Sequence, residues 1–242
     1  MAAVARHIAG CVVVADYMKE WLLDHGFHES QIRKIVYGVP VDDYSPSTFT
    51  AAVPCRFLVV GNFVEKKRPD LTLQAFQQCV DAGADARLTV IGDADLRPRC
   101  EQILDHYQLR DRVTLLGRQN KERVRAGMQS VSVFLQHSVT AKNGDMEGWP
   151  VAIGEAAACG LPVISTRHAS IPEQVDHGTT GYLVDEHDWQ EMGKRMLELS
   201  ASPDLRIAMG KAARAKAAQN DSAVQIAELE DFILEVATRN KS

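Results

Sequence analysis

Two carboxylates lie eight positions apart: Glu147 is just ahead of the apolar segment VAIGEAAACG, and Glu155 is within it. If this segment is helical, Glu155 lies about five residues inside it, roughly 7–8 Å further on at 1.5 Å per residue. Carboxylates at this spacing could accept hydrogen bonds from two hydroxyl-bearing parts of one extended ligand. Burying Glu155 without a bound partner or water would be costly. Two simpler interpretations stay open, with Glu147 complementing the helix dipole and Glu155 on an exposed helix face.

Three consecutive cations, Lys66, Lys67 and Arg68, follow a predicted strand that ends at Gly61. A glycine lets the backbone approach a ligand closely. The cations, together with the first-turn amides of a helix that starts near Pro69, could neutralise a phosphate group. On charge alone, a solvated basic turn is the alternative interpretation.

A polar loop, 138–150, leads into the helix that carries Glu155 and ends on Pro150 at the predicted first helical position. Proline suits that position, and the helix dipole favours an anion beside it. Two further polar loops, 92–97 and 167–173, also follow strands, but ordinary turns have the same composition.

These loops must be positioned by a regular alternation of strands and helices that begins at Arg56. Nearly unbroken apolar runs predict strands at 57–60, 88–91, 113–116, 131–135, 162–165 and 182–184. Helical segments are predicted between them at 69–82, 96–107, 121–129, 150–159 and near 171–175. This alternation predicts an α/β fold, a doubly wound, Rossmann-like parallel sheet of about six strands with helices on both faces. Such sheets bind ligands at the carboxyl ends of their strands.

The two ends of the chain follow other patterns. A strand at 11–15, a helix at 16–25 and a strand at 32–37 precede a turn-rich stretch without periodicity, 38–54, which predicts a linker. An apolar helical stripe begins at Trp189, and the chain continues with helices at 203–218 and 223–239. We therefore expect three parts, which are residues 1–54, a sheet domain at 55–220 and a C-terminal helix at 221–242.

Composition excludes several classes of protein. The 242 residues are 45% hydrophobic and 24% charged, which is typical of a globular chain with a sizeable core. A net charge of −5 offers no general attraction to nucleic acid, so no nucleic-acid partner is expected. Five dispersed cysteines favour a reducing compartment, and no apolar run approaches the length of a membrane span. The sequence lacks the dinucleotide fingerprint, the P-loop, G-x-S-x-G and H-E-x-x-H, and its histidines suggest no metal site.

Four segments, taken together, resemble the C-terminal half of the group 1 glycosyltransferases, which are retaining enzymes of the GT-B fold that use a nucleotide-sugar donor. GNFVEKK is similar to the family's GRLVxEKG, and GTTGYLVDEHD is similar to GxTGxLVxxxD. EGWPVAIGEAAACGLPVIST is similar to EGxPxxxLEAMAxGxPVIxT and contains the family's E-x(7)-E pair at Glu147 and Glu155. VADYMK through VPVDDYSP is similar to the segment that closes the family's N-terminal domain.

The resemblance implies roles for individual residues. Lys67 matches the lysine that holds the donor diphosphate, with Lys66 as its neighbour. Glu155 matches the residue that receives the ribose hydroxyls, and Glu147 matches the catalytic residue near the transferred sugar. The remaining donor-binding residues are expected to be the backbone at Gly148, Trp149 and Pro150 and the base-contacting loop around Arg118. The chain departs from the family pattern at two positions, since Asn62 replaces a second diphosphate-binding arginine and Arg68 replaces a glycine.

The resemblance also implies an activity, which is retaining transfer of a sugar from a nucleotide-diphosphate donor to a glycan or lipid-linked glycan. No cofactor and no metal are expected. Residues 1–54 are expected to be a remnant of the family's N-terminal domain, together with the linker. That domain binds the acceptor, and its remainder is missing here. We therefore expect this chain alone to be inactive. The main alternative is a non-catalytic donor-binding module that needs a separate partner chain. A cytoplasmic location, with peripheral membrane association of the intact enzyme, is a family-level expectation.

Overall fold

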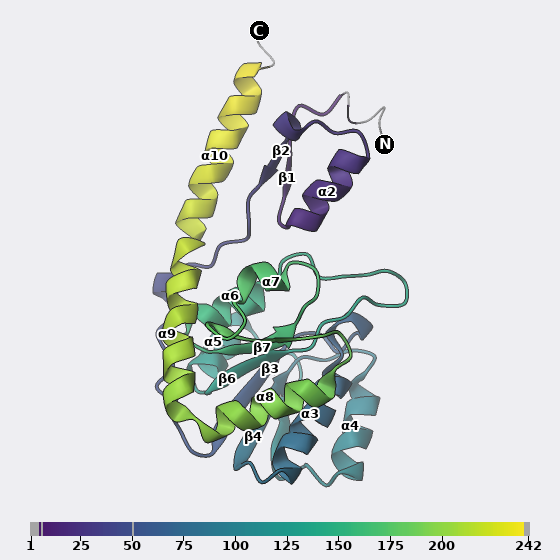
Figure 1. Cartoon of the computed structure of the whole chain (residues 1–242), viewed down its shortest axis with the longest axis vertical. Helices are drawn as coiled ribbons and strands as arrows, with labels where there is room; N and C mark the ends of the chain where they lie inside the picture. Colours follow the sequence, from purple (N-terminus) through teal and green to yellow (C-terminus); the bar gives the residue numbers. More distant parts are fainter. Residues whose placement is uncertain (1–4, 6, 50, 240–242) are drawn as a thin grey trace.

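The computed structural model describes residues 5, 7–49 and 51–239, and a six-stranded sheet forms its centre (Figure 1). The strand order is β5-β4-β3-β6-β7-β8, and every neighbouring pair is parallel. The strands are β3 (Cys55–Val60), β4 (Ala86–Ile91), β5 (Val113–Leu115), β6 (Val133–Gln136), β7 (Val163–Thr166) and β8 (Gly181–Val184). The doubly wound parallel sheet expected from the sequence is confirmed.

Helices cover both faces of this sheet, because successive strand residues point to opposite sides. Phe57 and Val59 belong to a core shared with α3 (Pro69–Asp81), α4 (Arg97–His106) and α8 (Trp189–Ala201). Leu58 points the other way and belongs to the core formed with α5, α6, α7 and α9. These helices are α5 (Lys121–Gln129), α6 (Val151–Ala158), α7 (Ile171–Gln174) and α9 (Pro203–Gln219). Buried apolar side chains on both faces explain why the strands are almost entirely hydrophobic.

The N-terminal segment forms a small unit of its own beside the C-terminal helix. Strands β1 (Cys11–Val13) and β2 (Ile32–Lys34) pair in parallel and pack with α2 (Asp16–Asp24). Helix α10 (Ser222–Arg239) lies alongside this unit, as Figure 1 shows. An ion pair of 2.5 Å between the Arg33 guanidinium and the Glu235 carboxylate joins the two. The chain therefore returns at its end to the segment with which it began.

The described part of the turn-rich stretch 38–54 contains one short 3₁₀ turn, Val41–Asp43, and packs closely on the sheet domain. Tyr44 is buried, and the Ser47 amide donates to the Cys159 carbonyl at 2.8 Å. A second 3₁₀ turn, Glu29–Gln31, precedes β2. Residues 38–49 and 51–54 form no long helix or strand, and their contacts anchor the segment to the sheet domain.

Several boundaries differ from the prediction: β1 and β2 end earlier than predicted, at Val13 and Lys34, and β3 and β4 begin earlier, at Cys55 and Ala86. Two further differences have a local reason. Helix α6 begins at Val151, and Pro150 is its N-cap, because the ψ angle of Pro150 is 103° and so is not helical. Strand β6 is shifted toward its carboxyl end, at Val133–Gln136, where it pairs with β7 through Gln136 and Ser165.

Candidate functional site

The loops that follow β3 and β6 meet at the carboxyl edge of the sheet, because these strands are neighbours. The loop after β3 forms a 3₁₀ turn, Glu65–Lys67, whose Lys66 carbonyl accepts a hydrogen bond from the Val139 amide at 2.9 Å. The Lys66 ammonium donates to the Asp145 carboxylate at 3.0 Å and to the Met146 carbonyl at 3.3 Å. Lys66 therefore fastens the two loops together.

Lys67 and Glu147 form an ion pair in this joined region, with 3.0 Å between Lys67 Nζ and Glu147 Oε1. Their side chains are only 18% and 8% exposed, so water screens the pair weakly. Burial lowers the pKa of Lys67, and the neighbouring Glu147 carboxylate opposes that shift. The structure thus brings together two residues that lie 80 positions apart in the sequence.

The backbone of Glu147 is held from two sides. Its amide donates to Nε2 of the buried His168 at 3.1 Å, and its carbonyl accepts from the Tyr17 hydroxyl at 3.0 Å. Nδ1 of His168 lies 2.6 Å from the Glu186 carboxylate, which fixes this nitrogen as the protonated one and Nε2 as the acceptor. Glu186 also accepts from the Thr140 amide at 2.9 Å. These supports could not be found from the sequence, because they come from helix α2 and from loops far apart in the chain.

Glu147 leads directly into α6, whose first turn has no side-chain cap. Uncapped first-turn amides, with the positive end of the helix dipole, favour an anion at this position. Gly148 passes close to the N-terminal unit, since a Cβ there would lie 3.2 Å from the Met18 side chain. The loop that enters α6 therefore passes close to α2 at Gly148, which is half-buried, while Pro150 is buried.

Glu155 has the partner that its apolar surroundings demand. Its Oε1 accepts a hydrogen bond of 2.6 Å from the hydroxyl of Tyr44. Burial and this hydrogen bond raise the pKa of Tyr44, so that its hydroxyl remains a donor. The Arg214 guanidinium donates to the Tyr44 carbonyl at 2.6 Å, and the Arg125 guanidinium lies 4.9 Å from the centre of the Tyr44 ring. The interpretation of Glu155 as an exposed face position is therefore wrong.

Arg68 adopts the backbone conformation that a glycine would take most easily. Its φ and ψ are 36° and 55°, in the left-handed region. Its guanidinium is clamped on Asp70 at 2.9 and 3.0 Å, and Arg99 donates to the same carboxylate at 2.8 Å. Burial alone would raise the pKa of Asp70, but the hydrogen bonds from the two arginines hold it below its usual value. The loop path is therefore maintained by an ion-pair cluster.

Asn62 lies in the same loop as Lys66 and Lys67, whereas Arg118 lies in a different one. Both side chains are exposed, and Arg118 follows the edge strand β5, two strands away from β3. The Asn62 carbonyl accepts from the Val64 amide at 2.9 Å, which shapes the turn before Lys66.

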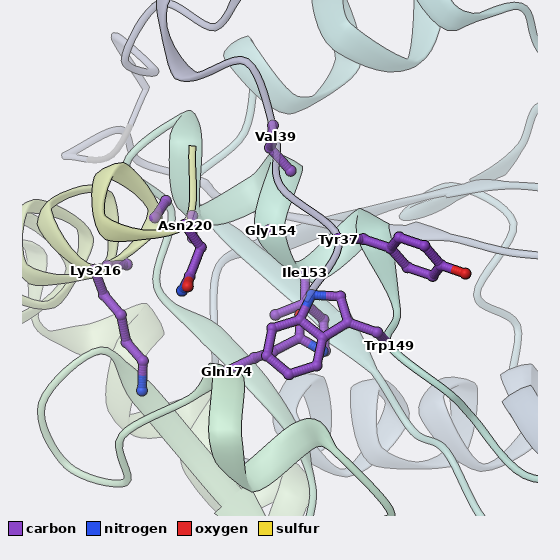
Figure 2. Close-up of a pocket in the computed structure, with 11 residues that line it drawn as sticks. Tyr37, Val39, Trp149, Ile153, Gly154, Gln174, Lys216 and Asn220 are labelled. Carbon is purple, nitrogen blue, oxygen red and sulfur yellow. The ribbon is translucent and has the colours of Figure 1, made fainter. Parts of the chain in front are cut away.

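The side chain of Trp149 lines a mainly apolar pocket between α6, α7 and α9, which Figure 2 shows. Its indole lies across this pocket near Ile153 and Gln174. Lys216 also lines the pocket and pairs with Asp176 at 2.6 Å. Trp149 therefore contributes its ring to packing, while its backbone continues the loop at the start of α6.

Within residues 5, 7–49 and 51–239, no group of three or more His, Cys, Asp or Glu side chains is arranged to hold a metal ion. Across the same residues, no helix has both the length and the apolar character that crossing a bilayer requires.

The fold is that of solved glycosyltransferases of the GT-B type. The Anabaena protein Alr3699/HepE in complex with UDP superimposes with a TM-score of 0.83 at 18% identity, over 94% of this chain and 64% of that one. Staphylococcus aureus TarM, solved with UDP as a G117R mutant, gives a TM-score of 0.81 at 17% identity, over 94% of this chain and 44% of that one. At these identities the similarity establishes the fold.

The family follows from the sequence. The model of glycosyl transferases group 1 matches residues 46–216, and the chain belongs to this family. The amylovoran biosynthesis glycosyltransferase AmsK of Erwinia amylovora is 36% identical over 163 residues, which are 67% of this chain and 40% of AmsK. N-acetyl-alpha-D-glucosaminyl L-malate synthase of Bacillus anthracis is 31% identical over 155 residues, 64% of this chain and 38% of that protein. The chain spans about 40% of the length of these relatives.

Proposed function

We propose that this chain binds the nucleotide-diphosphate sugar donor of a glycosyltransferase that transfers the sugar with retention of configuration. The observation that carries the proposal is the buried Lys67–Glu147 ion pair beside the uncapped start of α6. A cation and free helix amides at the carboxyl edge of a parallel sheet suit a diphosphate. The complexes of Alr3699/HepE and TarM with UDP support a nucleotide at this fold.

In this proposal, different residues of the site contact different parts of the nucleotide-sugar donor. Lys67 contacts the diphosphate and stabilises its charge as the bond to the sugar breaks. Glu147, as the catalytic residue, faces the transferred sugar, and one oxygen of Glu155 receives the ribose hydroxyls while Tyr44 holds the other. Arg118 contacts the base. Asn62, Lys66 and the backbone of Gly148, Trp149 and Pro150 complete the donor-binding set.

This mechanism needs neither a metal nor an organic cofactor, because the chain's own cations and helix amides neutralise the leaving diphosphate. The acceptor, a glycan or lipid-linked glycan, is bound by the part of the relatives that this chain does not span. The biosynthetic role named for AmsK supports a glycan acceptor. We place the intact enzyme in the cytoplasm, in peripheral contact with the membrane that carries such acceptors.

A second candidate is a donor-binding module that acts only with a separate chain. The exposed apolar side chains of α10, which include Ile226, Ile233 and Leu234, favour it. Val12 and Trp21 add exposed apolar surface on the N-terminal unit. Such surface is typical of a face that packs against another domain or chain.

Calorimetric titration of the full chain with UDP, GDP and ADP tests the proposal. We expect one nucleotide to bind, and we expect Lys67→Ala and Glu155→Gln each to weaken binding at least tenfold, roughly the effect of one charge-assisted hydrogen bond. Lys194→Ala is the matched control, because Lys194 is an exposed lysine of α8. Equal affinity in Lys67→Ala and in the control would contradict the site. Glu147→Gln should still bind the nucleotide, since its proposed role is at the sugar.

A further inference from the structure

Three arginines form a ladder across three neighbouring strands, at the end of the sheet opposite the Lys67–Glu147 pair. Arg56 of β3 stands directly beside Arg87 of β4 in the parallel register. Arg112 is level with Arg87, since the next residues, Leu88 and Val113, are register partners. Like charges opposite each other on adjacent strands repel. A negative charge bound beside the three guanidinium groups would relieve this repulsion.

In the part of the chain that the structure describes, no carboxylate forms an ion pair with any of the three arginines. Arg56 stacks on the Phe49 ring at 4.4 Å, and Arg87 donates to the Ala86 carbonyl at 3.3 Å. Nη1 of Arg112 is enclosed and has no hydrogen-bond partner. Many other arginines pair with carboxylates, as Arg97, Arg99, Arg110 and Arg195 do. The ladder differs from them in lacking an ion pair.

The three side chains line one cavity of about 450 Å³, which is more polar than apolar. The hydroxyl-bearing residues Thr89, Thr114 and Ser130 also line it. Asp111 is the one carboxylate among the cavity's lining residues, and it makes no ion pair with the ladder in the described structure. The cavity therefore combines three guanidinium groups, hydroxyls and room for a small polyanion.

We propose that this cavity is a second, separate binding site for a phosphate-type oxyanion. Guanidinium groups bind such oxyanions through paired, charge-assisted hydrogen bonds. A phosphorylated small molecule and the headgroup of an anionic lipid share this chemistry. The site is at the amino ends of β3, β4 and β5, whereas the proposed donor site is at carboxyl strand ends, so either can exist without the other.

Binding at the proposed donor site must first be weakened, because inorganic pyrophosphate could also bind there. We therefore use the full chain carrying Lys67→Ala as the reference and add Arg87→Gln and Arg112→Gln together. Arg110→Gln in the same reference is the matched control, since Arg110 is an exposed arginine paired with Asp105 close to β5. Each protein is titrated with inorganic pyrophosphate and, separately, floated with vesicles of phosphatidylglycerol or of phosphatidylcholine alone.

Pyrophosphate binding that the paired substitution weakens at least tenfold, while Arg110→Gln leaves it unchanged, supports the site with a soluble ligand. Flotation with phosphatidylglycerol alone, lost in the same variant, supports it with a lipid headgroup. Binding to neither probe, or equal binding by the variant and the control, overturns the proposal. The glutamines should not lower the thermal midpoint, because removing like charges relieves repulsion, so loss of binding will not reflect unfolding.

Discussion

The hydroxyl of Tyr44 lies 2.6 Å from Oε1 of Glu155, so that the turn-rich segment before the sheet holds a carboxylate of α6 in place. Tyr44→Phe removes this hydrogen bond without changing the ring. We expect the free energy of unfolding, measured by urea denaturation, to fall by about 1–2 kcal/mol, because the partly buried Glu155 carboxylate loses its hydrogen-bond donor. Nucleotide affinity should also fall severalfold in calorimetry. Tyr107→Phe, at an exposed tyrosine, should change neither.

The Lys67–Glu147 pair predicts a non-additive response in a double-mutant cycle. Lys67→Met leaves the Glu147 carboxylate buried without its cation and should cost roughly 3 kcal/mol of stability. Adding Glu147→Gln removes that stranded charge, so the double variant should regain part of the loss. Denaturation midpoints of the four proteins measure the coupling. Strict additivity would show that the pair does not stabilise the folded chain.

His168 predicts a difference between two substitutions at one position. Its Nε2 accepts from the Glu147 amide at 3.1 Å. Glutamine can present a carbonyl oxygen to that amide, whereas leucine leaves it unpaired. Among folded variants, His168→Gln should therefore bind the nucleotide-sugar donor more tightly than His168→Leu. Equal affinities in calorimetry would mean that this hydrogen bond does not position the loop.

His137 predicts a dependence of stability on pH. It is fully buried, and burial lowers its pKa from 6.5 to about 4. The unfolded chain therefore binds a proton as the pH falls below 6.5, while the folded chain resists protonation until about pH 4. The free energy of unfolding is therefore unaffected by His137 above pH 6.5. It falls by roughly 3 kcal/mol as the pH decreases from 6.5 to about 4. In His137→Gln, urea midpoints between pH 7 and pH 4.5 should depend less on pH, whereas the exposed His106→Gln should behave as wild type.

Arg68 predicts an unusual order of stability. Arg68→Ala loses the ion pair with Asp70 and keeps an unfavourable left-handed backbone, whereas Arg68→Gly loses the pair but relieves the backbone. The glycine variant should therefore be more stable than the alanine variant by about 1 kcal/mol, despite the greater flexibility of glycine when unfolded. Thermal unfolding of both proteins measures the difference. A more stable Arg68→Ala than Arg68→Gly would show that the backbone strain at this position is small.

Much of the fold could be predicted from the sequence because its signals are local. Apolar runs alternating with helical segments define β3 to β8, and the parallel sheet follows from that alternation. Boundaries were less predictable, as at Pro150, whose place as the N-cap depends on a ψ angle set by the preceding loop.

The site could be predicted only in part. Lys67 and Glu147 lie near loop–helix junctions after strands, and the resemblance to the group 1 glycosyltransferases singles them out there. The structure brings the two side chains together. The partners of Glu147 and Glu155 could not be found in this way, since Tyr17, Tyr44 and His168 reach them through contacts between segments far apart in the sequence. A single tyrosine or histidine, whether in a helix or in a loop, carries no local sequence pattern that indicates such a contact.

Helix α10 packs beside the N-terminal unit (Figure 1) but is translated much later. Arg33 and Glu235 are 202 positions apart, so the first strands emerge from the ribosome long before their helical neighbour exists. At typical elongation speeds of 5–20 residues per second, this interval is about 10–40 s. Meanwhile the surface beside Gly10, which in the finished molecule is covered by Val236 and Phe232, remains open to chaperones and to other nascent chains. The order of translation therefore delays the completion of this unit until α10 has been synthesised, and the unit is open to premature association until then.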